Sequence, residues 1–478
     1  MAFFAWFPIR NCRTWPARSN RRHSPPASKS ARIVGITMTY PPTPKTEGFL
    51  LAADAILADA YTLWLQAALR IDRGMIAETG PLATLAAAHP HLPLIRLTDH
   101  VLIPGLINAH THLELSFARE LIPPPRHFTD WVLQLVSLLP TEAQAEDKIP
   151  AATSSGAWEC LASGVTTVGD ISRFPALTRR TLAGLPLRTV SYGEITALGR
   201  SRDFLEQRLS SAADRRFQTP RLNIGLSPHA PYSVEGPALR RIVDAAIAGH
   251  MPLAMHLAEL AEESHFLSSL GGRLGRDWDL MKRLNLLDDQ IPLSSAGPVG
   301  WAAEWGLLKS HDTAQPALVL AHCNYLSDAD ILRIAAAGAS VAFCPRTHYY
   351  FGHSTSGEHP WRRLQAAGVN VCLATDSLAS NPDLTLLREA QWLLRGNPSI
   401  APNPLLEMMT TAGAKALGLA GRAGCLHVGH YADILAFSPP AEACGGGAQS
   451  LAEWLVKTAP PPRKVWAAGE QVWSDSAG

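Results

Sequence analysis

The segment that most constrains the fold is an apolar run, residues 101–109, that ends abruptly in His110 and His112. Side chains two positions apart on a strand point to the same side, so both imidazoles at a strand end can bind one metal ion. A second pair of this spacing, His89 and His91, flanks a proline after an alanine-rich run, and we interpret it as a surface loop. The first pair therefore predicts a strand whose C-terminal end carries metal ligands.

Three further apolar runs end in a metal-binding or proton-transferring side chain, namely His256, His322 and Asp376. Parallel β/α barrels place their chemistry at the C-terminal ends of the strands, so these endings predict one shared barrel mouth. Eight strand candidates alternate with helical stretches, and they finish near His112, Asp170, Glu194, His229, Glu259, His322, Pro345 and Asp376. A doubly wound open sheet is the alternative, but no Gly-x-Gly-x-x-Gly follows an early strand.

The chain length suits two modules better than one. With 478 residues it accommodates a barrel of about 300 residues plus a smaller unit. We expect an α/β fold: a (β/α)8 TIM-type barrel over residues 104–420, with a small β-sandwich formed by residues 47–103 and 421–478. Residues 1–46 contain eight basic and no acidic side chains, and we interpret them as disordered or as an extension from a start called too early, with Met38 as the alternative start.

The composition limits the classes of binding partner that we expect. Forty-two basic and 41 acidic residues leave no net field for nucleic acid or a membrane surface. No apolar stretch reaches the length of about 20 residues that a membrane span needs. The seven cysteines are scattered without a Cys-x-x-Cys pair, which favours buried, reduced thiols and a cytoplasmic location. We therefore expect a small-molecule substrate, no nucleic acid and no membrane.

The ordered set His110-Thr111-His112, His256, His322 and Asp376 resembles the amidohydrolase superfamily of metal-dependent hydrolases over about residues 48–475. Two motifs, His-Leu-Ala-Glu at 256–259 and Cys-Pro-Arg-Thr-His at 344–348, look like its deaminase and chlorohydrolase branch. More narrowly, the sequence is similar to the aminodeoxyfutalosine deaminases of menaquinone biosynthesis at 110–114, 350–353 and 375–381. The resemblance is compatible with a homodimer.

The number of metals follows from a missing residue. Binuclear members of the superfamily commonly bridge two metals with a carboxylated lysine on the fourth strand, but residues 151–281 contain no lysine and the fourth strand candidate ends in His229. We expect one divalent metal, held by His110, His112, His256 and Asp376. Three imidazoles and a carboxylate suit Zn²⁺, our first expectation, and also Fe²⁺.

A mechanism follows for three catalytic candidates. Metal coordination lowers the pKa of water from about 16 to about 7, but expelling ammonia also requires a group that protonates the ring nitrogen beside the attacked carbon. Glu259, three residues past His256, is the candidate for that proton. By resemblance, His322 is not a ligand and would orient or deprotonate the water, while Asp376 binds metal and helps to accept the proton.

Six residues near the expected mouth are candidates for substrate contact: His229, Glu114, Arg346, His348, His353 and Ser377. A basic side chain there pairs with a substrate carboxylate, and Tyr349, Tyr350 and Phe351 cover a large flat ligand. The alternative is that these side chains stabilise loops or form surface ion pairs and do not contact the substrate. We interpret Trp131 as helix packing. On this basis we expect aminodeoxyfutalosine to be a better substrate than adenosine.

Three function classes follow. The first is an aminohydrolase that deaminates a purine-like nucleoside, and the runner-up is a chlorohydrolase or other C–N hydrolase acting on a triazine-like or cyclic amidine substrate. The third, a binding or scaffold subunit, has no reason to retain every metal position. His112 and Glu114 also match half of the motif of zinc-dependent base deaminases, but the required Pro-Cys-x-x-Cys half is missing.

Overall fold

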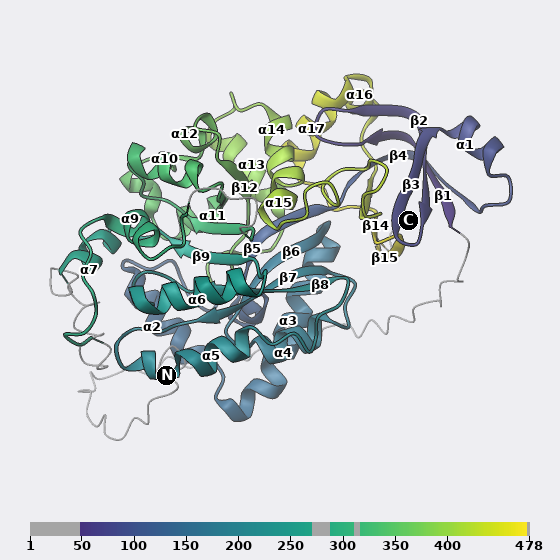
Figure 1. Ribbon diagram of the computed structural model, residues 1–478. Helices are drawn as coiled ribbons and strands as arrows, with labels where there is room; N and C mark the ends of the chain where they lie inside the picture. The colour runs from purple at the N-terminus through teal and green to yellow at the C-terminus, as the bar shows by residue number, and fades with distance from the viewer. Residues whose placement is uncertain (1–47, 270–286, 310–315, 476–478) are drawn as a thin grey trace, which may run out of the picture.

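The computed structural model describes residues 48–269, 287–309 and 316–475 (Figure 1). The predicted extension at residues 1–46 lies outside the described residues. The described part is built on two sheets, one parallel with eight strands and one mixed with seven. In Figure 1 the seven-stranded sheet lies to one side of the barrel and its helices.

The eight-stranded sheet is a nearly closed parallel barrel. Neighbouring strands pair in chain order, and a bridge between Thr111 and Asp376 joins the last strand region to the first. The predicted fold class is therefore confirmed. The strands are β5 (Leu106–Thr111), β6 (Val165–Ser172), β7 (Arg188–Ile195), β8 (Leu222–Pro228), β9 (Leu253–Leu257), β10 (Leu318–His322), β11 (Ser340–Phe343) and β12 (Asn370–Leu373).

Helices alternate with these strands and cover the outside of the barrel. In α6 the buried side chains Leu239, Ile242, Val243 and Ala246 recur every three or four residues, so one stripe packs inward. The main helices and turns are η1 (Leu113–Ala118), α2 (Phe128–Leu138), α3 (Glu142–Ala162), α4 (Pro175–Leu182), η2 (Gly199–Phe204), α5 (Leu205–Ala212), α6 (Gly236–Ala248), α7 (Glu263–Ser269), α9 (Gly297–Glu304), α10 (Asp328–Ala336), α11 (Pro345–Tyr350), η3 (His353–Ser356), α12 (Trp361–Ala366), α13 (Leu386–Gly396), α14 (Pro402–Met408) and α15 (Thr411–Ala416).

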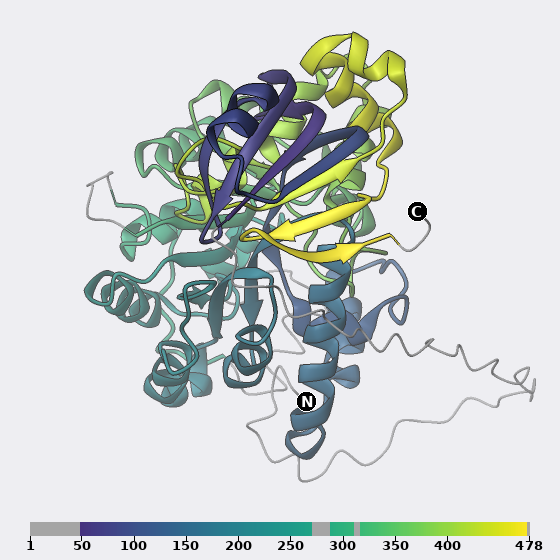
Figure 2. The same ribbon diagram turned by 90° about the vertical axis from the view of Figure 1, so that its right-hand side faces the viewer.

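The mixed sheet combines segments from both ends of the described chain, which lie side by side in Figure 2. Its order is β15-β14-β13-β4-β1-β2-β3, and only the β1–β4 pair is parallel. The strands are β1 (Phe49–Leu57), β2 (Leu63–Asp72), β3 (Met75–Pro81), β4 (Leu94–Pro104), β13 (Ile434–Phe437), β14 (Lys464–Ala467) and β15 (Glu470–Ser474). Three helices accompany it: α1 (Leu82–Ala88), α16 (Ala441–Gly445) and α17 (Gly447–Thr458).

The turn between β2 and β3 follows from its residues. Arg73 and Gly74 both have positive φ, at 48° and 76°, which matches the twist that a tight hairpin requires. The hydrogen bonding of the module runs through all seven strands as one sheet. The module boundaries at residues 103 and 420 stay a prediction.

Apolar side chains fill both the barrel interior and the layer between strands and helices. Ile107 and Ala109 point into the interior cluster, whereas Leu106 packs toward the outer one, as alternation along a strand requires. The six described cysteines are free. In the three described ranges, no helix combines the length and the apolar character needed to cross a membrane.

Candidate active site

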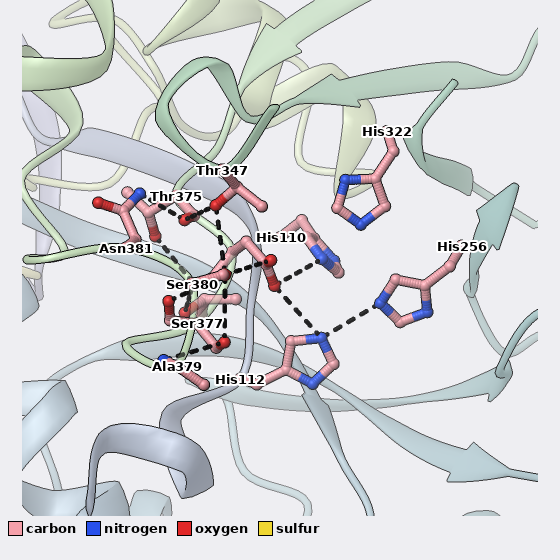
Figure 3. Close-up of polar contacts among 12 residues, drawn as sticks. His110, His112, His256, His322, Thr347, Thr375, Ser377, Ala379, Ser380 and Asn381 are labelled. Atoms are coloured by element: carbon pink, nitrogen blue, oxygen red, sulfur yellow. Dashed lines mark hydrogen bonds and ion pairs between the residues drawn. The ribbon is translucent and has the colours of Figure 1, made fainter. Parts of the chain in front are cut away.

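Four histidines converge at the C-terminal ends of the barrel strands (Figure 3). His110 lies at the end of β5, His256 on β9 and His322 at the end of β10, while His112 directly follows β5. The ring centroid of His110 lies 5.0 to 5.4 Å from those of the other three. Asp376, just after β12, approaches the same point, with its Oδ1 3.5 Å from His110 Nε2 and 3.7 Å from His112 Nε2.

The hydrogen bonds of these rings fit a bound cation. The Nδ1 of His256 lies 3.0 Å from the carbonyl oxygen of His229, and the ring of His112 forms a hydrogen bond with the backbone of Ile171. If each ring donates its proton outward in this way, both Nε2 atoms present lone pairs to one another across 3.2 Å. The two ring nitrogens of His110 are buried, and neither has a hydrogen-bond partner among the described residues. A divalent metal would bind one nitrogen of each of the three rings, His110, His112 and His256, because neutral imidazole is one of its usual ligands.

Asp376 is held in place at the seam of the barrel. Its Oδ2 accepts a hydrogen bond of 2.7 Å from the Ser380 hydroxyl, and its backbone carbonyl accepts one from the Thr111 hydroxyl. Its backbone has a left-handed φ of 58°. Burial alone would raise the pKa of Asp376, but the nearby imidazoles, His110 first, hold the pKa below its usual value. The carboxylate is therefore ionised, as a metal ligand must be.

Glu259 and His322 form a pair beside the four candidate metal ligands, which are His110, His112, His256 and Asp376. Glu259 Oε1 lies 3.6 Å from His322 Nε2, and Oε2 accepts a hydrogen bond of 3.3 Å from the Tyr232 hydroxyl. Burial, together with the charge of Asp376, raises the pKa of Glu259 well above its usual value. Burial lowers the pKa of His322 to about 3. The raised pKa of Glu259 favours the protonated carboxyl and the lowered pKa of His322 favours the neutral imidazole, which are a proton donor and a proton acceptor.

A pocket opens above this cluster and is largely apolar. Its aromatic wall comes from Phe128 and Trp131 of α2, with Phe351 against them at ring distances of 5.2 and 5.1 Å. Trp131 also donates its indole N–H to the carbonyl oxygen of Ala379. Trp131 packs in a buried apolar cluster, as the sequence predicts, but it also lines the pocket, which the interpretation as packing alone missed. The signal was the apolar spacing Phe128, Trp131, Leu135, which places three side chains on one helix face.

Three of the six predicted substrate contacts line this pocket: His229, Glu114 and Ser377. Glu114 is also held from behind, because its carboxylate accepts hydrogen bonds from the Ser172 hydroxyl and the Arg173 N–H. Sequence reasoning did not assign Arg173 and Tyr232 to the site, although both line the pocket. Arg173 directly follows β6, and Tyr232 lies three residues after His229, so their places at strand ends were the signal that could have found them.

The structure does not place Arg346, His348 or His353 among the pocket-lining residues. The guanidinium of Arg346 bonds Glu389 at 2.7 Å and Asp383 at 3.0 Å, so these internal carboxylates already occupy it. His348 Nδ1 lies 3.0 Å from Asn324 Oδ1, and His353 Nδ1 lies 3.0 Å from the Tyr325 hydroxyl. These side chains brace the loops of the mouth, and the expected pairing of Arg346 with a substrate is not what this geometry offers.

The three neighbouring aromatic residues, Tyr349, Tyr350 and Phe351, differ in whether they line the pocket. Phe351 lines the pocket, whereas Tyr349 is exposed and packs on Trp392. The Tyr350 hydroxyl donates to the backbone carbonyl of Ile122. Only one of the three rings therefore covers the site.

A second hollow of about 350 Å³ lies next to the pocket. Arg173 and Glu194 line both spaces, and the second one is lined by polar side chains such as Thr196 and Arg208 together with apolar ones such as Phe174 and Leu177.

Curated relatives are similar along most of their length. A 5-methylthioadenosine/S-adenosylhomocysteine deaminase from Syntrophobacter fumaroxidans is 30% identical over 405 residues, covering 80% of this chain and 84% of the relative. An aminodeoxyfutalosine deaminase from Deinococcus radiodurans is 31% identical over 354 residues, covering 72% and 79%.

Solved structures share the fold. The aminofutalosine deaminase of Helicobacter pylori in complex with methylthio-coformycin superimposes with a TM-score of 0.74 at 20% identity, covering 89% of this chain and all of that one. The zinc complex of atrazine chlorohydrolase from Arthrobacter aurescens gives a TM-score of 0.72 at 19% identity, covering 89% and 95%. The family model described as "Amidohydrolase family" matches residues 101–472. Together with the four converging donors, this match shows that the chain belongs to the amidohydrolase family.

Proposed function

We propose that this chain is a metal-dependent aminohydrolase that deaminates a purine-like nucleoside by hydrolysis. The observation that carries the proposal is the buried pair of Glu259 and His322, 3.6 Å apart, beside a set of converging metal donors. Two relatives that carry deaminase names, each about 30% identical over most of the chain, support the same reaction.

The metal is a divalent ion, and we propose one ion per chain, Zn²⁺ before Fe²⁺, held by His110, His112, His256 and Asp376. When bound, such an ion supplies Lewis-acid activation of a water molecule near neutral pH. A cytoplasmic location and a homodimer stay predictions.

Each proton transfer is then assigned to one of the residues around the metal ligands. His322, neutral and buried, accepts a proton from the attacking water. Glu259 donates its proton to the ring nitrogen next to the attacked carbon, takes up the second proton of the attacking water and passes it to the departing amino group, and it regains its own proton from His322. A carbon–oxygen bond forms, the carbon–nitrogen bond breaks, and ammonia leaves. The ionised Asp376 stabilises the positive charge that His322 gains.

The shape of the site favours a nucleoside with a large substituent. The aromatic wall of Phe128, Trp131 and Phe351 suits a flat base, because ring faces pack on one another. The second hollow, which shares Arg173 and Glu194 with the pocket, provides room for a further group. We therefore propose that aminodeoxyfutalosine is preferred over adenosine, with Arg173 rather than Arg346 as the cation nearest to the substrate.

Ammonia release from the metal-loaded protein tests the reaction. The panel contains aminodeoxyfutalosine, 5-methylthioadenosine, S-adenosylhomocysteine and adenosine, with chloride release from atrazine as the competing chemistry. We expect ammonia from the first three at a higher kcat/KM than from adenosine. Equal or higher kcat/KM for adenosine would remove the preference for a large substituent, and chloride release without ammonia release would replace the deaminase proposal with the chlorohydrolase one.

A further inference from the structure

The turn that carries Glu259 is held by a second buried carboxylate, that of Glu263. Three successive backbone N–H groups donate to it: those of Ala258 and Leu260 at 2.9 Å and that of Glu259 at 2.7 Å. Glu263 is the first residue of α7 and is only 2% exposed. Ala258 has a left-handed φ of 50°, a conformation that costs free energy for a residue with a side chain and persists only where neighbours enforce it.

Both polar groups of the Glu259 backbone are thereby engaged by side chains. The N–H donates to Glu263, and the carbonyl oxygen accepts a hydrogen bond of 3.0 Å from the side-chain amide of Asn324. The carboxyl of Glu259 is left facing Tyr232 and His322. The direction in which this carboxyl points is therefore set by the frame that fixes its backbone.

We propose that Glu263 is a positioning residue, which holds the 258–260 turn so that the Glu259 carboxyl reaches the reacting atoms. The activity part of this inference rests on the proposed function. Oε1 of Glu263 accepts two of the three N–H groups and Oε2 accepts the third. A glutamine at this position keeps the volume but has one acceptor oxygen, and its NH₂ group opposes a backbone donor. Displacing a catalytic group by about 1 Å can cost on the order of 10²-fold in rate.

The test compares E263Q with E262Q. Glu262 is the adjacent residue, exposed to solvent, so E262Q makes the same change of charge without touching the turn. Assays at pH 8 lie above the value of about 7 to which burial raises the pKa of Glu263. With the best substrate of the panel, we expect E263Q to lower kcat by roughly 10- to 100-fold with KM and metal content unchanged. E262Q should match the wild type.

A double variant separates positioning from general structural support. If Glu263 acts through Glu259, then E259Q/E263Q is no slower than E259Q alone, because the group being positioned is already removed. Multiplying losses in the double variant, or loss of metal together with activity in E263Q, would overturn the inference. If E263Q does not fold, E263D, which keeps the charge but shortens the side chain, replaces it in every comparison.

Amide hydrogen exchange tests the clamp without any substrate. The amides of residues 258–260 should exchange faster in E263Q than in the wild type, and E262Q should leave them unchanged. Unchanged exchange in E263Q would overturn the inference. Faster exchange in a protein that releases no ammonia from any member of the panel would leave the clamp standing and count against the proposed function alone.

Discussion

At the residue scale, burial separates the acids of the site from its bases. Burial lowers the pKa of His112 and of His322 to about 3, so both imidazoles stay neutral and keep a lone pair. The pKa values of the two nearby carboxyls shift in opposite directions, since that of Glu259 is raised and that of Asp376 is lowered. Opposite shifts of two carboxyls in one site are the pattern expected of a proton donor beside a charged ligand.

Replacing the donor tests this division. Glu259→Gln keeps the size of the side chain but cannot donate a carboxyl proton, so kcat should fall by about 10² or more while the metal content stays at the wild-type level. Steady-state kinetics and metal analysis of the same preparation provide the two readings, with E262Q as the control. Parallel loss of metal and activity would make Glu259 a ligand instead.

Glu114 predicts a pH dependence of stability. Burial raises its pKa from 4.5 to about 7, so the folded state holds this proton more tightly than the unfolded chain. Its contribution is complete below pH 4.5 and is lost as the pH rises through about 7, a change on the order of 3 kcal/mol. Glu114→Gln cannot titrate and should lack this change. Urea unfolding of both proteins at pH 4.5 and pH 8 measures it, and an identical wild-type-to-variant difference at the two pH values would contradict it.

At the scale of elements, the loops of the mouth are tied to one another by buried ion pairs. Arg346, in α11, bonds Asp383 in the loop after β12 and Glu389 in α13. The Glu389 side chain is completely buried, and Arg346 is 10% exposed. This connection holds α11, whose neighbour Phe351 covers the pocket, against the helix that follows the last barrel strand.

Arg346→Ala should therefore destabilise the protein rather than change its choice of substrate. Removing Arg346 leaves the buried carboxylate of Glu389 without a cation, at a cost of about 3 to 5 kcal/mol. Arg388→Ala is the matched control, because Arg388 also pairs with Asp383 but is 54% exposed, and its loss should cost no more than about 1 kcal/mol. Denaturant unfolding measures both. If Arg346→Ala changed the ratio of kcat/KM between aminodeoxyfutalosine and adenosine at unchanged stability, Arg346 would be a substrate-binding residue after all.

The limits of sequence reasoning are also clearest at this scale. The ends of the barrel strands were predictable, because an apolar run followed by histidine or aspartate marks the point where a buried strand meets the mouth. The partners of Arg346 were not, because Glu389 lies 43 positions away and nothing local distinguishes it from a surface glutamate. The position of α2 over the pocket was hidden for the same reason, since its apolar face matches that of a helix packed on a core.

At the scale of the whole molecule, the donors span the barrel. His110 and His112 belong to the first strand region, His256 to the fifth strand and Asp376 to the segment after the last one. An ion bound by the proposed ligands would therefore connect the two sides of the seam where Thr111 meets Asp376. Because the unfolded chain does not assemble these ligands, binding of the ion should stabilise the folded state.

Removing the metal should consequently lower the melting temperature. At a free ion concentration 1,000 times the Kd, the stabilisation amounts to about 4 kcal/mol. Thermal unfolding before and after dialysis against a chelator, and again after Zn²⁺ is added back, measures the effect. His112→Ala is the control, because it lacks one donor and should respond weakly to both treatments. Equal responses of the two proteins would show that the ion binds elsewhere.

The mixed sheet has a consequence for how the protein is made. β4 pairs with β13, yet Ile434 leaves the ribosome 330 residues after Pro104. At 5 to 20 residues per second, the edge of β4 at Val101 to Pro104 waits roughly 15 to 65 s for its partner. An unpaired strand edge is a template for association with other chains. Translation that stalls before β13 should therefore yield aggregating fragments, and nascent chains should require chaperones over this interval.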